Sequence, residues 1–200
     1  MIIIIIAITA IISFLAFQNR DISDKLRFNA FAIKHEKEGW RFFSYALIHA
    51  NWTHLFINMF VLYSFGDVVI KAFRYLFDIK GFFYFILLYV GGTIFSVLFD
   101  FRKNKENPYY NAVGASGAVS AVVFSSILIY PTGSVYLFLI PFPIPSAIFG
   151  ILYLVYSAYM SKRSKDNIGH SAHFWGAVFG LVFTIILKPA LVMAFIDQVF

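Results

Sequence analysis

The longest uncharged run is the feature that most constrains how this chain can fold. Residues 107–161 contain no Asp, Glu, Lys or Arg, whereas one membrane-spanning helix needs only about 20 mostly apolar residues. Besides Pro108 near its start, four prolines interrupt the run, at Pro131, Pro141, Pro143 and Pro145. Helix interiors resist proline, because it removes a backbone hydrogen bond and clashes with the preceding turn. We therefore expect two helices in this run, separated by the proline-rich part.

The overall composition supports a membrane protein. Hydrophobic residues make up 60% of the 200 residues and charged residues 13%, while soluble domains have about 45–50% apolar and about 25% charged residues. The mean hydropathy is +0.79. A soluble globule of this size has too little interior to hide so many apolar side chains. The composition therefore excludes soluble, disordered and collagen-like proteins.

The uncharged runs predict six membrane-spanning helices, at residues 1–18, 50–66, 81–99, 116–130, 146–160 and 170–187. The first run lacks the basic start and the cleavage site of a signal peptide, so we expect it to be retained. Residues 19–49 mix charges with aromatic side chains, which is typical of an amphipathic segment lying at the membrane surface. The predicted fold class is an all-α polytopic membrane protein, with residues 1–200 forming one domain.

The charges predict partners and orientation. The net charge is +6, but the basic residues stand in short gaps between apolar runs, where lipid headgroups rather than nucleic acid are the nearest partner. The loops after the first, third and fifth helices hold twelve of the 16 Lys and Arg residues, which places those loops in the cytoplasm by the positive-inside rule. The absence of cysteine excludes disulfides, thiolate metal sites and a cysteine nucleophile.

Polar side chains inside apolar runs need a reason, because an unsatisfied polar group in lipid costs several kcal/mol. They are His49, His54, Asn58, His170 and His173. No carboxylate lies inside any predicted span, which argues against an aspartyl protease, a zinc protease with a catalytic Glu, and an ion-coupled transporter. A site of four histidines without a carboxylate is also a weak metal site, so we expect no metal and no cofactor.

A serine with a histidine base is the chemistry that these residues leave open. Ser116 follows Gly114 and precedes Gly117 at the start of the fourth predicted helix. Small residues there permit close helix packing and also leave room for a substrate strand, and a helix N-terminus favours developing negative charge. A serine nucleophile needs a general base within hydrogen-bond reach. His173, at the start of the sixth predicted helix on the same side of the membrane, is the best candidate.

The other polar residues support either a functional or a structural role. His54 and Asn58 are four residues apart and so share one helical face. Both can donate hydrogen bonds to an oxyanion, and both can equally join two helices as a polar pair. One base is enough for the reaction, so we expect a structural role for His170.

Four motifs together resemble the rhomboid intramembrane serine proteases. They are Trp40-Arg41, the segment 49–58 with sequence HANWTHLFIN, the segment 114–117 with sequence GASG, and the segment 172–180 with sequence AHFWGAVFG. Each motif is modest alone. Their order, and their placement on the second, fourth and sixth predicted helices, make a coincidence improbable.

The resemblance implies a six-helix bundle with a Ser–His dyad in a cavity that opens outside the cytoplasm. Ser116 corresponds to the nucleophile and His173 to its base, with His54, Asn58 and the Ser116 backbone N–H binding the oxyanion. The implied enzyme is a serine endopeptidase without metal or cofactor that cuts transmembrane segments of other membrane proteins. The implied location is the lipid bilayer of a bacterial inner membrane, with the active site on the extracytoplasmic side.

The resemblance also implies supporting residues and shows two departures. Trp40 and Arg41 correspond to an architectural motif, and His49 to a buried supporting histidine. Gly114 and Gly117 flank the serine, whereas Gly176 and Gly180 correspond to sites of close helix packing; these four residues are expected to have structural roles. Many members carry Tyr one turn after the serine, where this chain has Ser120. The family orientation opposes the positive-inside count, and we follow the family, because six of the twelve cations lie in the first loop.

Two alternatives remain open. A catalytically inactive rhomboid-like protein that binds transmembrane helices needs the fold and the Trp40-Arg41 loop but not Ser116. The second alternative is a transporter. Transport that survives replacement of Ser116 would favour it.

Overall fold

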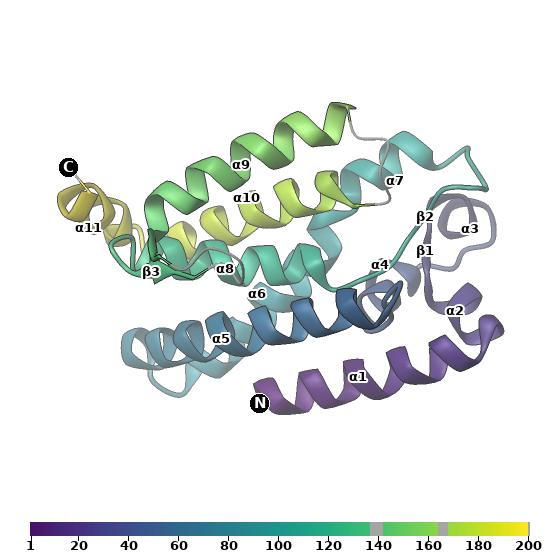
Figure 1. The fold of residues 1–200 in the computed structure, drawn as a ribbon, viewed down its shortest axis with the longest axis horizontal. Coiled ribbons are helices and arrows are strands. Elements are labelled where there is room, and N and C mark those ends of the chain that lie inside the picture. Colours follow the sequence, from purple (N-terminus) through teal and green to yellow (C-terminus); the bar gives the residue numbers. More distant parts are fainter. Residues whose placement is uncertain (137–141, 164–167, 200) are drawn as a thin grey trace.

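The computed structural model describes residues 1–136, 142–163 and 168–199, and Pro141 lies outside these ranges. Most of the described chain is helical. Six helices run along one another in alternating directions (Figure 1). They are α1 (Ile2–Gln18), α5 (Trp52–Phe77), α6 (Lys80–Ser96), α8 (Ser116–Ile129), α9 (Ser146–Arg163) and α10 (His170–Leu187).

Within the described ranges, three helical segments are long and apolar enough to cross a membrane, at Trp52–Phe77, Lys80–Asn104 and His170–Leu187. Shorter apolar helices lie at Ile2–Gln18, Ser116–Ile129 and Ala190–Val199. These segments confirm that the chain is a mainly helical integral membrane protein. The all-α prediction needs one correction, because two short antiparallel strand pairs are present. β1 (Phe28–Asn29) pairs with β2 (Asn111–Ala112), and β3 (Ser134–Val135) pairs with β4 (Ile144–Pro145).

Helix α5 is longer than the predicted span at 50–66, and it continues to Phe77. The charges that marked the predicted end are accommodated on the helix itself. Asp67 and Lys71 form an exposed ion pair one turn apart, with 2.6 Å between their charged groups, and Arg74 lies over the ring of Phe82. A charge therefore does not end a helix when it finds a partner on the same face or on the next helix.

The third predicted span, at 81–99, is divided. Helix α6 ends at Ser96, and α7 (Leu98–Asn104) follows after a break at Val97. Asp100 in α7 is buried, and Ser171 and Tyr110 interact with its carboxylate. Polar partners within the protein offset part of the cost of burying a carboxylate, so the helical path continues beyond the first charge.

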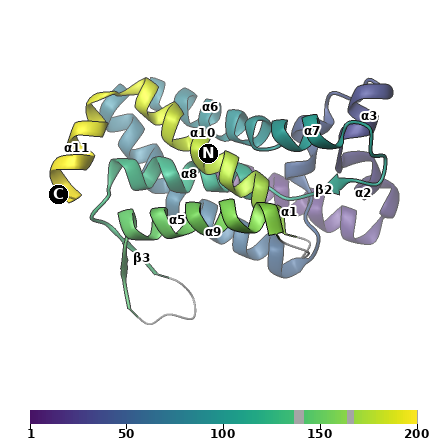
Figure 2. The ribbon, with the colours of Figure 1, turned by 90° about the horizontal axis from the view of Figure 1, so that it is seen from above.

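The C-terminal part also extends past the predictions. Helix α9 ends at Arg163 rather than residue 160, since the guanidinium packs on the Tyr159 ring and donates a 2.8 Å hydrogen bond to its hydroxyl. A further helix, α11 (Ala190–Val199), was not predicted. The last predicted span stops at residue 187, two residues before Pro189, but proline is also favoured at helix starts. Figure 2 shows α11 and β3 at the opposite end of the bundle from α2 and α3.

The predicted interfacial segment, residues 19–49, is folded rather than a simple loop. It contains α2 (Arg20–Leu26), β1, α3 (Ala30–His35), α4 (Arg41–Ser44) and a short 3₁₀ helix (Tyr45–Leu47). Arg41 is buried and donates 2.8 Å hydrogen bonds to the carbonyls of Asp24 and Arg27, and it also pairs with Glu38. Trp40 is half exposed. The Arg41 guanidinium thus closes this segment on itself.

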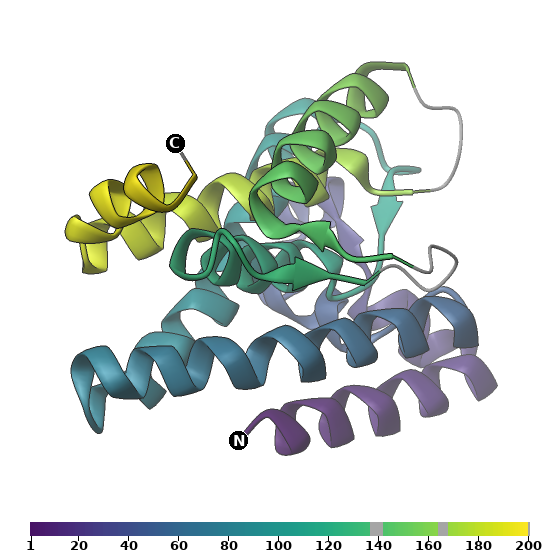
Figure 3. The same ribbon diagram turned by 60° about the vertical axis from the view of Figure 1, so that its left-hand side comes forward.

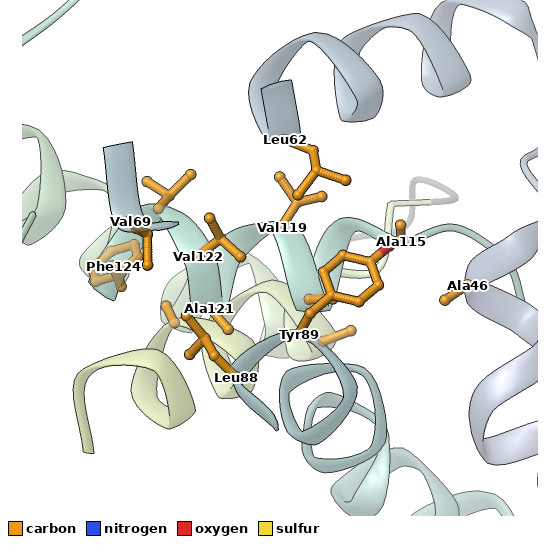
Figure 4. Close-up of a cluster of buried hydrophobic side chains, with 14 of the residues drawn as sticks. Ala46, Leu62, Val69, Leu88, Tyr89, Ala115, Val119, Ala121, Val122 and Phe124 are labelled. Atoms are coloured by element: carbon orange, nitrogen blue, oxygen red, sulfur yellow. The ribbon is translucent and has the colours of Figure 1, made fainter. Parts of the chain in front are cut away.

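The core centres on α8, where every residue from Gly117 to Leu128 is buried. Figure 4 shows Val119, Val122 and Phe124 of α8 among buried side chains from α5 and α6. Small residues on α8 let the neighbouring helices approach it closely, as is usual where helices pack in lipid. Helix α1 lies alongside α5 at the outside of the bundle (Figure 3).

Candidate active site

Ser116 begins α8 at the end of the bundle where α2, α3 and α4 gather (Figure 1). The two residues before it are fixed by hydrogen bonds from the segment 19–49. The Gly114 N–H donates to the carbonyl of Tyr45 at 2.9 Å, and the Ala115 N–H donates to Nε2 of His49 at 3.4 Å. The first N–H groups of a helix have no partner within the helix. The Ser116 N–H, at the first position of α8, therefore has no acceptor within its own helix.

His49 is held in one tautomer by a serine from the first helix. The Ser13 hydroxyl donates to the carbonyl of Leu47 at 3.0 Å and lies 3.0 Å from Nδ1 of His49. A hydroxyl has a single proton, so Nδ1 of His49 must be the donor and Nε2 the acceptor. Burial, with a further contribution from His54, lowers the pKa of His49 to about 3. The neutral ring thus links α1 to the residue before Ser116.

His54 lies against the loop that carries the serine. A Cβ atom added to Gly114 would come within 2.5 Å of Cε1 and 2.9 Å of Nε2 of the His54 ring, and Gly114 has a φ of +112°. The rings of His49 and His54 meet edge to face with centroids 5.0 Å apart. Only glycine fits at position 114, because its φ and the His54 ring both exclude a side chain.

Asn58 is buried one turn after His54 on α5. One of its amide hydrogens is used within the helix, since Nδ2 donates to the carbonyl of His54 at 2.8 Å. The second amide hydrogen remains as a donor. The structure therefore places His54 at the serine loop, with Asn58 one turn further along α5.

The starts of α8 and α10 are brought together by glycines. A Cβ atom on Gly176 would lie 2.1 Å from the carbonyl oxygen of Gly117, and a Cβ atom on Gly180 would lie 2.1 Å from that of Ala121. A Cβ atom on Gly117 would also lie 3.4 Å from the carbonyl oxygen of Ala172. The residue after Ser116 thus touches residues on both sides of His173.

His173 lies in the first turn of α10, three residues after His170. Its ring stacks with that of Tyr153 from α9, with centroids 6.3 Å apart and an interplanar angle of 26°. The His170 ring meets it edge to face at 6.1 Å. Within the described residues, no hydrogen bond joins the Ser116 hydroxyl to the His173 ring; such bonds are often long in enzymes without substrate.

The sequence argument did not identify three side chains at the site. Ser13 could have been noticed in the sequence, because a hydroxyl in an apolar run needs a hydrogen-bond partner. Tyr153 is one of 12 tyrosines in the chain, and nothing in the sequence distinguishes it. Asp100 lies just beyond the third predicted span and interacts with Ser171, while its neighbour Phe99 stacks on Trp175 with centroids 3.7 Å apart. Helix α7 thereby anchors the start of α10.

No group of three or more His, Asp or Glu side chains that could hold a metal ion occurs in the described part of the chain. His49 and His54 lie near each other, and His170 and His173 form a second pair. The chemistry that these side chains offer is a hydroxyl near an imidazole, with N–H donors close by.

Comparison with known proteins gives two matches. The profile of the Rhomboid domain matches residues 36–190, a range that includes every motif from Trp40 to Gly180. The chain is also similar to RHOMBOID-like protein 12, mitochondrial, from Arabidopsis thaliana. The two are 27% identical over 149 residues, which covers 68% of this chain and 43% of the plant protein. The chain therefore matches less than half the length of that relative.

Proposed function

Because the chain belongs to the rhomboid family, we propose that it is an intramembrane serine endopeptidase with Ser116 as nucleophile and His173 as general base. The observation that carries this proposal is the glycine-packed crossing of α8 and α10. Gly117 contacts both Ala172 and Gly176, and it is the chain neighbour of the serine. This close packing of the segments that carry Ser116 and His173 supports the proposed dyad.

The proposed reaction proceeds through an acyl-enzyme. The Ser116 oxygen attacks the scissile carbonyl carbon while the His173 ring takes the hydroxyl proton. The oxyanion accepts hydrogen bonds from the Ser116 N–H, His54 and Asn58. His173 then gives its proton to the leaving amine as the peptide bond breaks. Water, activated by the same ring, releases the acid product and restores Ser116.

We propose that α1, α5, α6, α8, α9 and α10 are the six spans of the rhomboid-like bundle. Their alternating directions put the starts of α5, α8 and α10 at one end (Figure 1). By the family orientation this end faces away from the cytoplasm, which opposes the positive-inside count. Arg41, one of the cations of the first loop, is buried, and its guanidinium donates hydrogen bonds to two backbone carbonyls of that loop. Such a folded segment differs from the short loops on which that rule rests.

The proposed substrates are transmembrane segments of other membrane proteins. A helix protects its carbonyl groups by hydrogen bonds, so the substrate must unwind before Ser116 can attack. We therefore expect cleavage next to small or helix-weakening residues, where unwinding costs least.

Cleavage by the purified full chain in liposomes tests the proposal. Wild type should cut a generic single-span substrate, and Ser116→Ala and His173→Ala should each lose more than about a thousandfold in rate. Ser126→Ala, a buried serine on the same helix, is the matched control and should cut normally. EDTA should leave activity intact. Cleavage that survives Ser116→Ala would contradict the assigned nucleophile.

A second candidate is a non-catalytic protein that binds transmembrane helices. The observation that favours it is Ser120 at the position of the family tyrosine; in the part of the chain that the structure describes, Ser116 and His173 also share no hydrogen bond. Failure of wild type to cut several substrates, with binding of a single-span helix unchanged by Ser116→Ala, would support this function.

A further inference from the structure

The ring that stacks on His173 comes from α9. Tyr153 also packs against Phe124 of α8 and Phe149 of α9, with centroids 5.5 and 5.8 Å apart. Aromatic pairs attract at centroid separations of about 4.5–7 Å. The imidazole at the start of α10 thus belongs to an aromatic group whose members come from α8, α9 and α10.

The Tyr153 hydroxyl is fixed by α8. It lies 2.8 Å from the hydroxyl of Ser120, and Ser120 is buried one turn after Ser116. A tyrosine at position 120 would occupy the space that the Tyr153 hydroxyl now fills. Ser120 therefore serves as the anchor for a ring that is supplied by another helix.

Helix α9 packs mainly against α10 and also contacts α8. Its buried residues are small: Ser146, Ala147, Gly150 and Ser157. Most of its large apolar side chains are exposed, such as Ile151, Leu152 and Val155. Gly150 packs on Ile127 of α8 at ordinary close contact. Near the site, the Tyr153–Ser120 contact joins α9 to α8 through a side-chain hydrogen bond.

We propose that Tyr153 is a positioning residue for His173, that Ser120 holds it in place, and that alignment of the base therefore depends on the position of α9. This inference rests on the proposed function. Among the described residues, no carboxylate hydrogen-bonds the His173 ring to orient it. A displacement of α9 that parts Tyr153 from Ser120 also removes the ring from His173, so the attachment of this helix and the alignment of the dyad change together.

Substitutions of Tyr153 separate the ring from the hydroxyl. Tyr153→Leu removes the ring and should lower kcat about tenfold with little change in KM. Tyr153→Phe and Ser120→Ala keep the ring but lose the hydroxyl contact, and each should lower kcat about threefold. The double variant should be no slower than either single variant, because both remove the same contact. Tyr159→Leu, an exposed tyrosine on the same helix, is the matched control.

A transplanted ring gives the sharpest test. Adding Ser120→Tyr to Tyr153→Leu places a ring on α8 next to His173, and this variant should recover most of the lost kcat. The rate at which Ser116 reacts with a fluorophosphonate probe, measured across pH 5–9, should rank the variants in the same order as their kcat values. A purely structural role for Tyr153 would lower the unfolding temperature without changing kcat or the pH profile of labelling.

The outcomes separate the two proposals. If wild type cuts and Tyr153→Leu retains its full kcat, the role of Tyr153 is refuted while the protease stands. If wild type neither cuts nor reacts with the probe, the proposed function itself fails. If kcat falls in Tyr153→Leu and does not recover when Ser120→Tyr is added, the role of the ring is contradicted. The loss of kcat would then be explained by disturbed helix packing alone.

Discussion

The serine and the histidine of the proposed dyad are held by different forces. The serine loop is fixed by hydrogen bonds from segments far away in sequence, through Tyr45, His49 and Ser13. His173 is placed by packing, through the glycine contacts of α10 and the Tyr153 ring. Hydrogen bonds can fix a loop, whose backbone groups need partners in any case. A ring without a carboxylate partner has only its neighbours' shapes to orient it.

Replacing a packing glycine should have the largest effect. In Gly176→Ala the new methyl group would lie 2.1 Å from the Gly117 carbonyl, so α8 and α10 must separate. We expect cleavage to fall more than about a hundredfold, because a displacement of about 1 Å at the site is that costly. The free energy of unfolding should fall by about 1–3 kcal/mol. Gly39→Ala, which meets no atom within 4 Å, should be neutral in both assays.

Replacing the glycine before the serine should have the next largest effect. Gly114→Ala puts a side chain at a φ of +112° and against the His54 ring. The strain costs about 1–3 kcal/mol, and we expect cleavage to fall about tenfold because the serine loop or His54 must shift. A crystal structure or kinetic assay that finds His54 and the rate unchanged would contradict this role.

Removing the distant hydrogen bond should have a smaller effect. Ser13→Ala takes away the partner of His49 Nδ1, so the Ala115 N–H loses a fixed acceptor. Leaving a buried donor unpaired costs about 1–3 kcal/mol in stability, and we expect a drop in kcat of about fivefold. Ser13→Thr keeps the hydroxyl and should restore most of the rate. Equal rates for wild type and Ser13→Ala would show that the hydrogen bonds from Ser13 through His49 to Ala115 do not affect the reactivity of Ser116.

The pH dependence of stability should show the smallest change. Because the folded-state pKa of His49 is about 3 and the unfolded value is about 6.5, the unfolded state binds a proton first as the pH falls. Stability should therefore decrease below about pH 6.5, by at most about 1.4 kcal/mol per pH unit from this group. His49→Gln keeps an acceptor but does not titrate. Its unfolding temperature should depend less on pH between 6.5 and 4, and an unchanged slope would contradict the assignment.

The sequence predicted the membrane class and the family, because both follow from residue types in long runs and from motifs with fixed order. It misplaced helix ends wherever it took a charge as a boundary. Asp67, Arg74 and Asp100 each have a partner in the folded chain. Such partners cannot be identified from the amino-acid sequence alone.

For the candidate site, the sequence predicted some of the close contacts and missed others. The glycines at positions 114, 117, 176 and 180 were recognisable because close backbone approach permits few other residues. The Tyr153–His173 contact was not, since it joins two helices whose mutual rotation is set by packing. Ser120 marked the place where a family tyrosine is missing, but the sequence could not say which helix supplies a ring.

Covalent labelling tests the central claim most directly. The full chain in detergent is treated with a fluorophosphonate probe, which reacts with activated serine hydroxyls, and the modified residue is identified by mass spectrometry. The account predicts modification of Ser116 in wild type, and labelling at least about a hundredfold slower in His173→Ala. Modification of a different serine, or equal labelling rates in wild type and His173→Ala, would contradict it.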